Sequence, residues 1–145
     1  MTLRLATEID ILRVLANLTG PDYDEIVAGT GRAPIAIAGS FPFSTRVALL
    51  KDTPVALYGI SHDHLGTHPF LLTTPAVRGA GLGRFIVEHG RELVSRWTEA
   101  HGPLTNLVYT KNHAHIRFVR AMGFTLGETR KCGPLLHHFT EFTNV

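Results

Sequence analysis

The stretch TTPAVRGAGLGRFIVEHGRELVSRW, residues 73–97, constrains the fold more than any other part of the sequence. An apolar run at 68–74, HPFLLTT, has the length of a strand and leads into it. Three glycines, Gly79, Gly81 and Gly83, then crowd one short turn. Apolar residues follow at the i, i+3, i+4 spacing of an amphipathic helix of about four turns. We therefore expect a strand that ends in a glycine-rich turn and opens directly into a helix.

Such a turn can bind an anion. The first amides of a helix lack partners within the helix, and the helix dipole adds about half a positive charge there. Glycines let a phosphate approach the backbone closely, and Arg78 and Arg84 flank the turn with further charge. A plain tight turn is the alternative. A Walker loop is excluded because no Lys-Ser or Lys-Thr follows Gly83, and a Rossmann fingerprint needs two residues before its last glycine.

Length and composition fit one globular domain spanning residues 1–145. The chain is 44% hydrophobic and 18% charged, which argues against disorder. Its net charge of +2 gives no bulk electrostatic reason to expect nucleic acid as a partner. Cys132 is the only cysteine, so no intramolecular disulfide forms and a reducing compartment fits best. No signal-type leader and no apolar run near membrane-spanning length is present, so we expect a cytoplasmic protein without a membrane partner.

The first part of the chain predicts a strand and two short helices. Residues 2–6 alternate in the manner of a strand, and Thr7 is typical of a helix N-cap. Gly20-Pro21 is expected to end the first helix, and residues 22–29 predict a second helix closed by Gly29. The Gly- and Pro-containing stretch 31–44 gives no clear signal.

The remainder predicts six further strands and two helices. A hairpin is indicated by two apolar runs around 51–53, and residues 112–123 predict a helix that begins at Asn112 and ends at Gly123. The resulting order is β-α-α-β-β-β-α-β-α-β-β. It predicts an α/β domain with a mixed, mostly antiparallel sheet flanked by helices.

Two motifs resemble the GNAT N-acetyltransferase superfamily. Arg78-Gly79-Ala80-Gly81-Leu82-Gly83 matches its Arg/Gln-x-x-Gly-x-Gly/Ala signature, and NHAHIRFVRAMGF at 112–124 is similar to a later helix that starts with Asn and ends in Gly-Phe. The element order extends the resemblance to most of the chain. It implies acetyl-CoA as co-substrate and a primary amine as acceptor. It leaves the oligomeric state open, although such proteins are often homodimers. It places the cofactor contacts at Thr73, Val77, Arg78, Gly79, Ala80, Gly81, Leu82, Gly83, Arg84 and Asn112.

A narrower resemblance covers nearly the full length. RVALLKDTPVALYGI, FLLTT and LTNLVYTKNHAHIRFVRAMGF are similar to a small GNAT-like family of short-tailed phages that is labelled internal virion protein A. The label implies a virion or host protein as partner and the host cytoplasm or virion as location, but it establishes no activity. Two hypotheses follow. One is an N-acetyltransferase acting on a small-molecule or protein amine, including a host protein during infection; the other is a virion or interaction protein that keeps the fold without the chemistry.

The expected proton donor is missing at one position. Many GNAT enzymes carry a Tyr seven residues after the helix-opening Asn, which protonates the departing thiolate, and Val119 stands there in this chain. Tyr58 and Tyr109, on predicted strands near the expected cleft, are the candidate catalytic residues. Packing is the simpler role for each tyrosine. Asn112 can cap its helix, contact the pantetheine arm, or do both.

Two polar clusters allow further roles. SHDHLGTH at 61–68 could supply a base of near-neutral pKa beside the substrate, whereas a zinc site is disfavoured because no cysteine or helical spacing accompanies it, so we expect no metal. Asp22, Asp24 and Glu25 could attract a cationic amine, or could form an ordinary solvated helix start.

Overall fold

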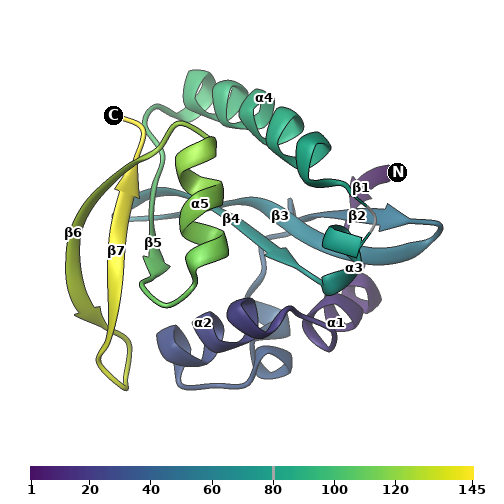
Figure 1. The fold of residues 1–145 in the computed structure, drawn as a ribbon, viewed down its shortest axis with the longest axis horizontal. Helices are drawn as coiled ribbons and strands as arrows, with labels where there is room; N and C mark the ends of the chain where they lie inside the picture. Colours follow the sequence, from purple (N-terminus) through teal and green to yellow (C-terminus); the bar gives the residue numbers. More distant parts are fainter. Residues whose placement is uncertain (80) are drawn as a thin grey trace.

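Two antiparallel sheets form the centre of the computed structural model, which describes residues 1–79 and 81–145 (Figure 1). The first sheet has the order β1-β2-β3-β4, with β1 at Thr2–Leu5, β2 at Arg46–Leu50, β3 at Thr53–Asp63 and β4 at Gly66–Thr73. The second has the order β5-β7-β6, with β5 at Thr105–Tyr109, β6 at Thr125–Cys132 and β7 at His137–Thr143. The helical elements are α1 (Glu8–Leu15), α2 (Gly20–Thr30), the 3₁₀ helix η1 (Pro34–Ser40), α3 (Pro75–Gly79), α4 (Gly83–His101) and α5 (His113–Ala121).

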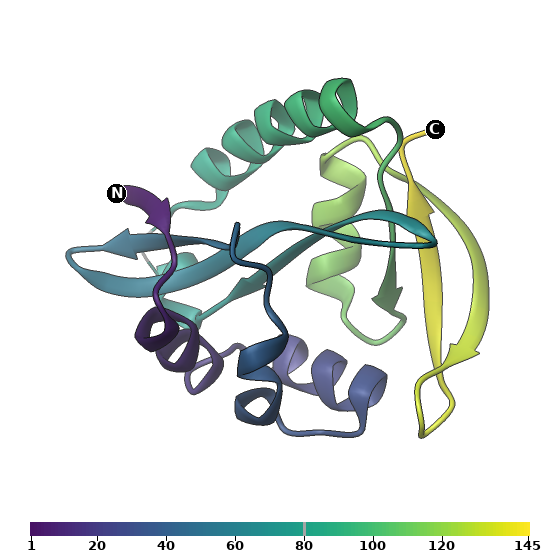
Figure 2. The ribbon, with the colours of Figure 1, turned by 180° about the vertical axis from the view of Figure 1, so that it is seen from behind.

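The two sheets meet where β4 and β5 begin. A parallel bridge joins Thr67 to Leu104, and Asn106 Nδ2 donates a hydrogen bond to the Pro69 carbonyl at 2.8 Å. Beyond this junction the two strands diverge toward their carboxyl ends in both views (Figures 1 and 2). A parallel pair that separates exposes backbone groups on the facing edges, and the candidate site lies at this gap.

Alternating side chains give the first sheet an apolar face on each side. Val47 and Leu57 pack in a cluster with residues of α1 and α2, whereas Ala48 and Tyr58, their neighbours in sequence, pack in a second cluster that α4 covers. This is the period of two that a strand imposes. Figure 2 shows α1, α2 and η1 together on one side and α4 on the other.

The expected order of elements is confirmed apart from two additional short helices, η1 and α3, and several boundary signals are confirmed as well. Thr7 caps α1 in a reciprocal capping box with Asp10. The Asn112 side chain accepts a hydrogen bond from the His115 N–H at 3.2 Å and caps α5. Lys51 and Asp52, with φ values of 49° and 66°, form the left-handed two-residue turn between β2 and β3.

Other expectations were wrong in detail. Gly20-Pro21 begins α2 instead of ending α1, because proline is compatible with the first turn of a helix and Thr19 supplies the cap. α2 ends at Gly31, whose φ of +69° closes the helix, and Gly29 lies inside it. The stretch 31–44, for which the sequence gives no clear signal, contains η1. The short helix α3 precedes the glycine turn. The expected antiparallel strands are divided between two sheets, and the parallel bridge between Thr67 and Leu104 joins them.

No helix in the described part of the chain has both the length and the apolar character needed to cross a membrane.

Candidate functional site

The gap between β4 and β5 exposes a backbone edge. Thr74 N–H donates to the Val55 carbonyl at 2.9 Å, so Thr74 is directed toward β3, and every second residue of β4 shares that direction. Leu71 and Thr73 are therefore turned the other way, toward β5. Thr73 N–H is bonded to Asp22, which leaves Leu71 as the β4 residue whose N–H and C=O face the open gap. An extended ligand could pair with this peptide unit as a strand would.

Asp22 of α2 closes the carboxyl end of the gap. Its Oδ2 accepts hydrogen bonds from Thr73 N–H at 2.9 Å and Thr73 Oγ1 at 3.1 Å. Its Oδ1 accepts from Asn112 Nδ2 at 3.0 Å. Asp22 is 7% exposed and Asn112 only 1%. One buried carboxylate thus connects α2, the end of β4 and the start of α5.

Glu25, one turn further along α2, connects β5 to α5. Its Oε1 accepts from Tyr109 N–H at 2.9 Å, and its Oε2 lies 3.0 Å from His115 Nδ1. The side chains of Glu25 and His115 are each 13% exposed. Burial alone would lower the pKa of His115, but the charge and hydrogen bond of Glu25, helped by the charge of Asp22, outweigh burial and raise it. The site therefore favours a protonated imidazole.

The glycine turn has open space in front of its backbone. A Cβ atom built on Gly79, Gly81 or Gly83 would meet no atom within 4 Å. Only Gly81, with a φ of +67°, requires glycine for its backbone conformation. Leu82 is the N-cap of α4 and makes no side-chain hydrogen bond, so the cap residue leaves the first amides of the helix without a side-chain acceptor. Packing does not explain the glycines at 79 and 83, and this open surface is available to a ligand.

The flanking residues hold this turn in place. Val77 is buried in the cluster beneath α4, and Leu82 packs against the same cluster. Arg84 Nε donates to Glu88 at 2.9 Å on the exposed side of α4, and Arg78 is exposed. Ala80, another predicted contact, lies outside the described residues. The cofactor contacts expected at these positions stay predictions.

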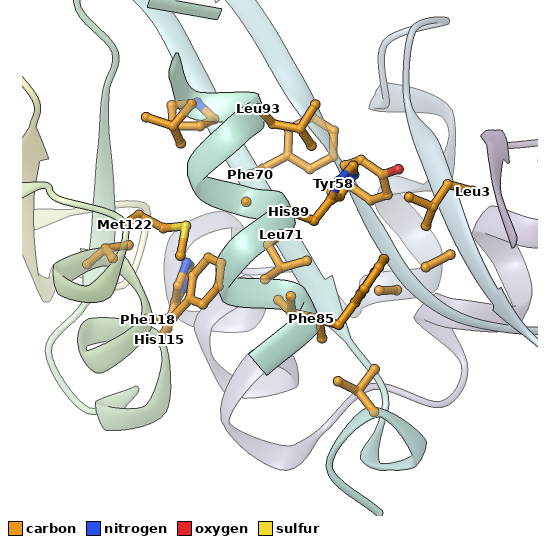
Figure 3. Close-up of a pocket in the computed structure, with 18 of the residues that line it drawn as sticks. Leu3, Tyr58, Phe70, Leu71, Phe85, His89, Leu93, His115, Phe118 and Met122 are labelled. Carbon is orange, nitrogen blue, oxygen red and sulfur yellow. The ribbon is translucent and has the colours of Figure 1, made fainter. Parts of the chain in front are cut away.

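A cavity of about 90 Å³ lies between α4, α5 and the first sheet (Figure 3). Its lining is apolar except for Tyr58, His89 and His115. Tyr58 is 8% exposed, and its hydroxyl has no hydrogen-bond partner in the described structure. No residue of α4 is fully buried: the apolar side of this helix packs against the cluster on the first sheet and also lines the cavity.

The two candidate tyrosines lie in different places. Tyr58 lines the cavity beneath α4, with its ring edge-on to His89 at a centroid distance of 6.1 Å. Tyr109 is 6% exposed and packs against His137 and Phe139, at centroid distances of 5.7 and 5.3 Å. It lines a second hollow of about 490 Å³ beside α2, to which Asp24 also contributes. The structure therefore does not bring the two tyrosines together in one site.

Asn112 is fully engaged within the protein. Its amide oxygen caps α5 and its amide nitrogen donates to Asp22. Val119, at the position of the missing tyrosine, is 3% exposed and packs with Leu104, Phe142 and other core residues. The capping role of Asn112 is thus observed, while a contact with pantetheine stays a prediction.

The histidine-rich stretch ties the β3–β4 hairpin to β5. His68 Nε2 lies 2.7 Å from Asp63 Oδ1, and its Nδ1 donates to the Thr105 carbonyl at 2.7 Å. Burial would lower the pKa of His68, yet the bonds to Asp63 and to the Thr105 carbonyl outweigh burial and raise it. Within residues 1–79 and 81–145, no group of three or more His, Cys, Asp or Glu is arranged to hold a metal ion.

Sequence reasoning missed the buried network as a unit. The sequence indicates for Asp22 and Glu25 either an attractor of a cationic amine or a solvated helix start, and it does not indicate His115 as a catalytic residue. Their i, i+3 spacing on one helix face was a readable signal. Their partners, however, are 51 to 90 positions away, so no local pattern could identify them.

Solved structures share this fold over the whole chain. A ribosomal-protein-alanine N-acetyltransferase from Brucella melitensis superposes with a TM-score of 0.67 at 19% identity, covering 100% of this chain and 99% of its own. An N-acetyltransferase from Staphylococcus aureus Mu50 gives 0.71 at 13% identity, covering 98% and 96%. A GNAT phosphinothricin acetyltransferase from Sinorhizobium meliloti, solved in complex with acetyl-CoA, gives 0.66 at 18% identity, covering 98% and 86%.

These comparisons confirm the expected fold class, that of the GNAT N-acetyltransferases. No model of a protein family matches the sequence, and no curated protein matches it significantly. The neighbours described here are bacterial proteins, and they lend no support to the narrower resemblance to the phage family.

Proposed function

We propose that the chain is an acetyl-CoA-dependent N-acetyltransferase that acetylates a primary amine. The gap between β4 and β5 carries this proposal, because it presents the Leu71 peptide to an extended ligand, and the glycine turn that follows β4 and α3 has open space in front of its backbone. A GNAT enzyme of the same fold holds acetyl-CoA. The proposal assigns the pyrophosphate to the turn from Gly79 to Arg84 and the pantetheine arm to the exposed edge of β4.

The proposed reaction is a direct attack of the amine on the thioester carbon of acetyl-CoA. The N–H of Leu71 would stabilise the negative charge that develops on the thioester oxygen, and removing such a donor typically costs about 10²–10³ in rate. Positioning of the two reactants supplies much of the remaining acceleration. The protein need not form a covalent intermediate.

The amine acceptor is proposed to approach the gap from the hollow beside α2, which is lined in part by Tyr109 of β5. Among the three acidic residues at the start of this helix, Asp22 and Glu25 are committed to the buried network. Asp24 is exposed and lines the hollow, so its carboxylate is free to attract a protonated amine. The hollow has no feature that distinguishes a small amine from a protein terminus.

Calorimetric titration with acetyl-CoA tests the cofactor site. We expect micromolar affinity, about −8 kcal/mol. Gly83→Ala should weaken binding at least about tenfold, or 1.4 kcal/mol, because its methyl group enters the space left for the pyrophosphate. Gly39→Ala is the matched control, since a Cβ there also meets no atom within 4 Å and the residue lies in η1, away from the turn. Equal affinities in the two variants would contradict the proposal, as would no binding at millimolar ligand.

The alternative is a protein with this fold and no catalysis. The burial of Val119 favours it, because the position that commonly supplies an acid belongs here to the apolar core. If the chain is a phage protein, this alternative predicts that it is present in purified virions or bound to a host protein. Mass spectrometry of purified particles tests that version, and absence of the chain from them would count against it.

A further inference from the structure

We propose that His115 is the proton donor to the departing CoA thiolate, and that Glu25 is the residue that positions its imidazole. The inference rests on the proposed acetyl transfer and names a residue for the step at which the C–S bond breaks.

The step requires a proton at sulfur. When the amine attacks, a C–N bond forms, and the C–S bond then breaks with its electron pair remaining on sulfur. His115 Nε2–H gives its proton to that sulfur, and the surplus proton on nitrogen passes to water. Water then reprotonates His115. The products are the amide and free CoA thiol, so no further reactant is needed.

Few side chains around the cavity can supply this proton. Among the described residues that line it, Tyr58, His89 and His115 carry a transferable proton. Tyr58 and His89 face each other between β3 and α4. His115 projects from α5 into the same space as Leu71, the residue whose N–H is assigned to the thioester oxygen (Figure 3). A thioester bound at Leu71 would therefore lie in the cavity that the imidazole lines.

The imidazole is oriented by its carboxylate. Glu25 lies within hydrogen-bond distance of His115 Nδ1, at 3.0 Å from Oε2 and 3.2 Å from Oε1. The carboxylate accepts the Nδ1 proton, which leaves Nε2 for the cavity. This is the arrangement in which a carboxylate fixes the tautomer of a catalytic histidine.

The charges around His115 favour a donor over a base. Glu25 and Asp22 face it from α2, and Tyr58 and His89 are the other titratable groups of the cavity lining. Burial lowers the pKa of His115, but the two carboxylates outweigh burial and raise it. The two carboxylates therefore favour the imidazolium form, and activity is expected to fall as the pH rises through this raised pKa.

The thiol of bound CoA gives a test that needs no acceptor. Its pKa can be read from the ultraviolet absorbance of the thiolate, with the complex of desulfo-CoA as blank. A neighbouring imidazolium should lower this pKa below the value of about 8.5 for an ordinary thiol. His115→Gln should remove the lowering, and Glu25→Gln should reduce it. His113→Gln, at the exposed neighbouring histidine of α5, should leave it unchanged.

Transfer assays with a panel of primary amines give the second readout. His115→Gln should reduce the rate about 10²–10⁴-fold, the usual contribution of a general acid. Its acetyl-CoA affinity should change less than about twofold, because a group that acts only in the transition state contributes to the rate and not to ground-state binding. Glu25→Gln should shift the alkaline fall of activity to lower pH. Circular dichroism checks that each variant is folded. If His115→Gln does not fold, the test uses Glu25→Gln instead.

Failure of the role proposed for His115 can be distinguished from failure of the proposed function. A thiol pKa that is the same in wild type and His115→Gln, with CoA bound in both, would overturn the role of His115 and leave the proposed function intact. A wild-type protein that binds neither CoA nor acetyl-CoA would overturn the proposed function itself.

Discussion

Asp22 shows how one residue can hold a site together. Its carboxylate accepts three hydrogen bonds, two from Thr73 at the end of β4 and one from Asn112 at the start of α5. Because Asn112 also caps α5, the position of that helix depends on the same carboxylate. Asp22 thus links the end of β4 to the start of α5, the helix that follows β5.

We expect Asp22→Ala to lower the free energy of unfolding by about 2–4 kcal/mol, because it leaves buried donors without an acceptor. Urea denaturation followed by circular dichroism measures this change. Asp24→Ala, two residues away on the exposed side of α2, should stay within about 0.5 kcal/mol of wild type. Similar losses in the two variants would show that the network adds nothing to stability.

Prediction from sequence succeeded where a residue acts on its neighbours. The caps Thr7 and Asn112 bond to groups three positions away, and their residue types alone indicate that role. Asp22, Glu25 and His115 act on partners that only the folded chain brings near. Their roles could therefore not be predicted before the strands and helices were placed.

At the scale of elements, α2 is held at both ends. Its start is tied to β4 through Asp22, and its end lies against the turn between β6 and β7. A Cβ atom on Gly133 in that turn would come within 2.7 Å of the Gly29 carbonyl oxygen and 2.8 Å of the Ala28 carbonyl oxygen. The turn can approach the helix this closely only because residue 133 lacks a side chain.

Gly133→Ala is expected to be more destabilising than Gly123→Ala. Both glycines have a positive φ, 75° and 92°, so each substitution costs about 1–2 kcal/mol of backbone strain. Gly123 has open space around it, whereas an alanine at 133 must also displace the end of α2, at a further cost of about 1–3 kcal/mol. Thermal or urea unfolding of the two variants measures the difference. Equal losses would mean that the turn does not press on α2.

The order of elements could be predicted because apolar periodicity is local. The boundary between α1 and α2 could not, since Gly20-Pro21 is compatible with either the end of one helix or the first turn of the next. The division into two sheets also escaped prediction. It depends on which strands pair, and pairing is decided by residues far apart in the chain.

At the scale of the whole molecule, a ligand in the gap contacts both sheets and should stabilise the protein as a unit. At about 100 times its dissociation constant, acetyl-CoA should add about 2.7 kcal/mol to the free energy of unfolding. For a chain of this length that corresponds to a rise in Tm of about 5–10 °C. Differential scanning fluorimetry with acetyl-CoA and with adenosine as control checks the value. An unchanged Tm at millimolar acetyl-CoA would contradict a cofactor site.

The junction of the two sheets also determines at what stage of folding the gap between β4 and β5 forms. β2, β3 and β4 are joined by short turns, and so are β6 and β7, so each of these groups can form from nearby residues. β1 and β5 pair with strands that lie much further along the chain, and such pairings form slowly. The gap needs β5 in its final position beside β4, and so it is complete only when folding ends. A ligand of the gap therefore prolongs the lifetime of the native protein and leaves the time required to fold unchanged.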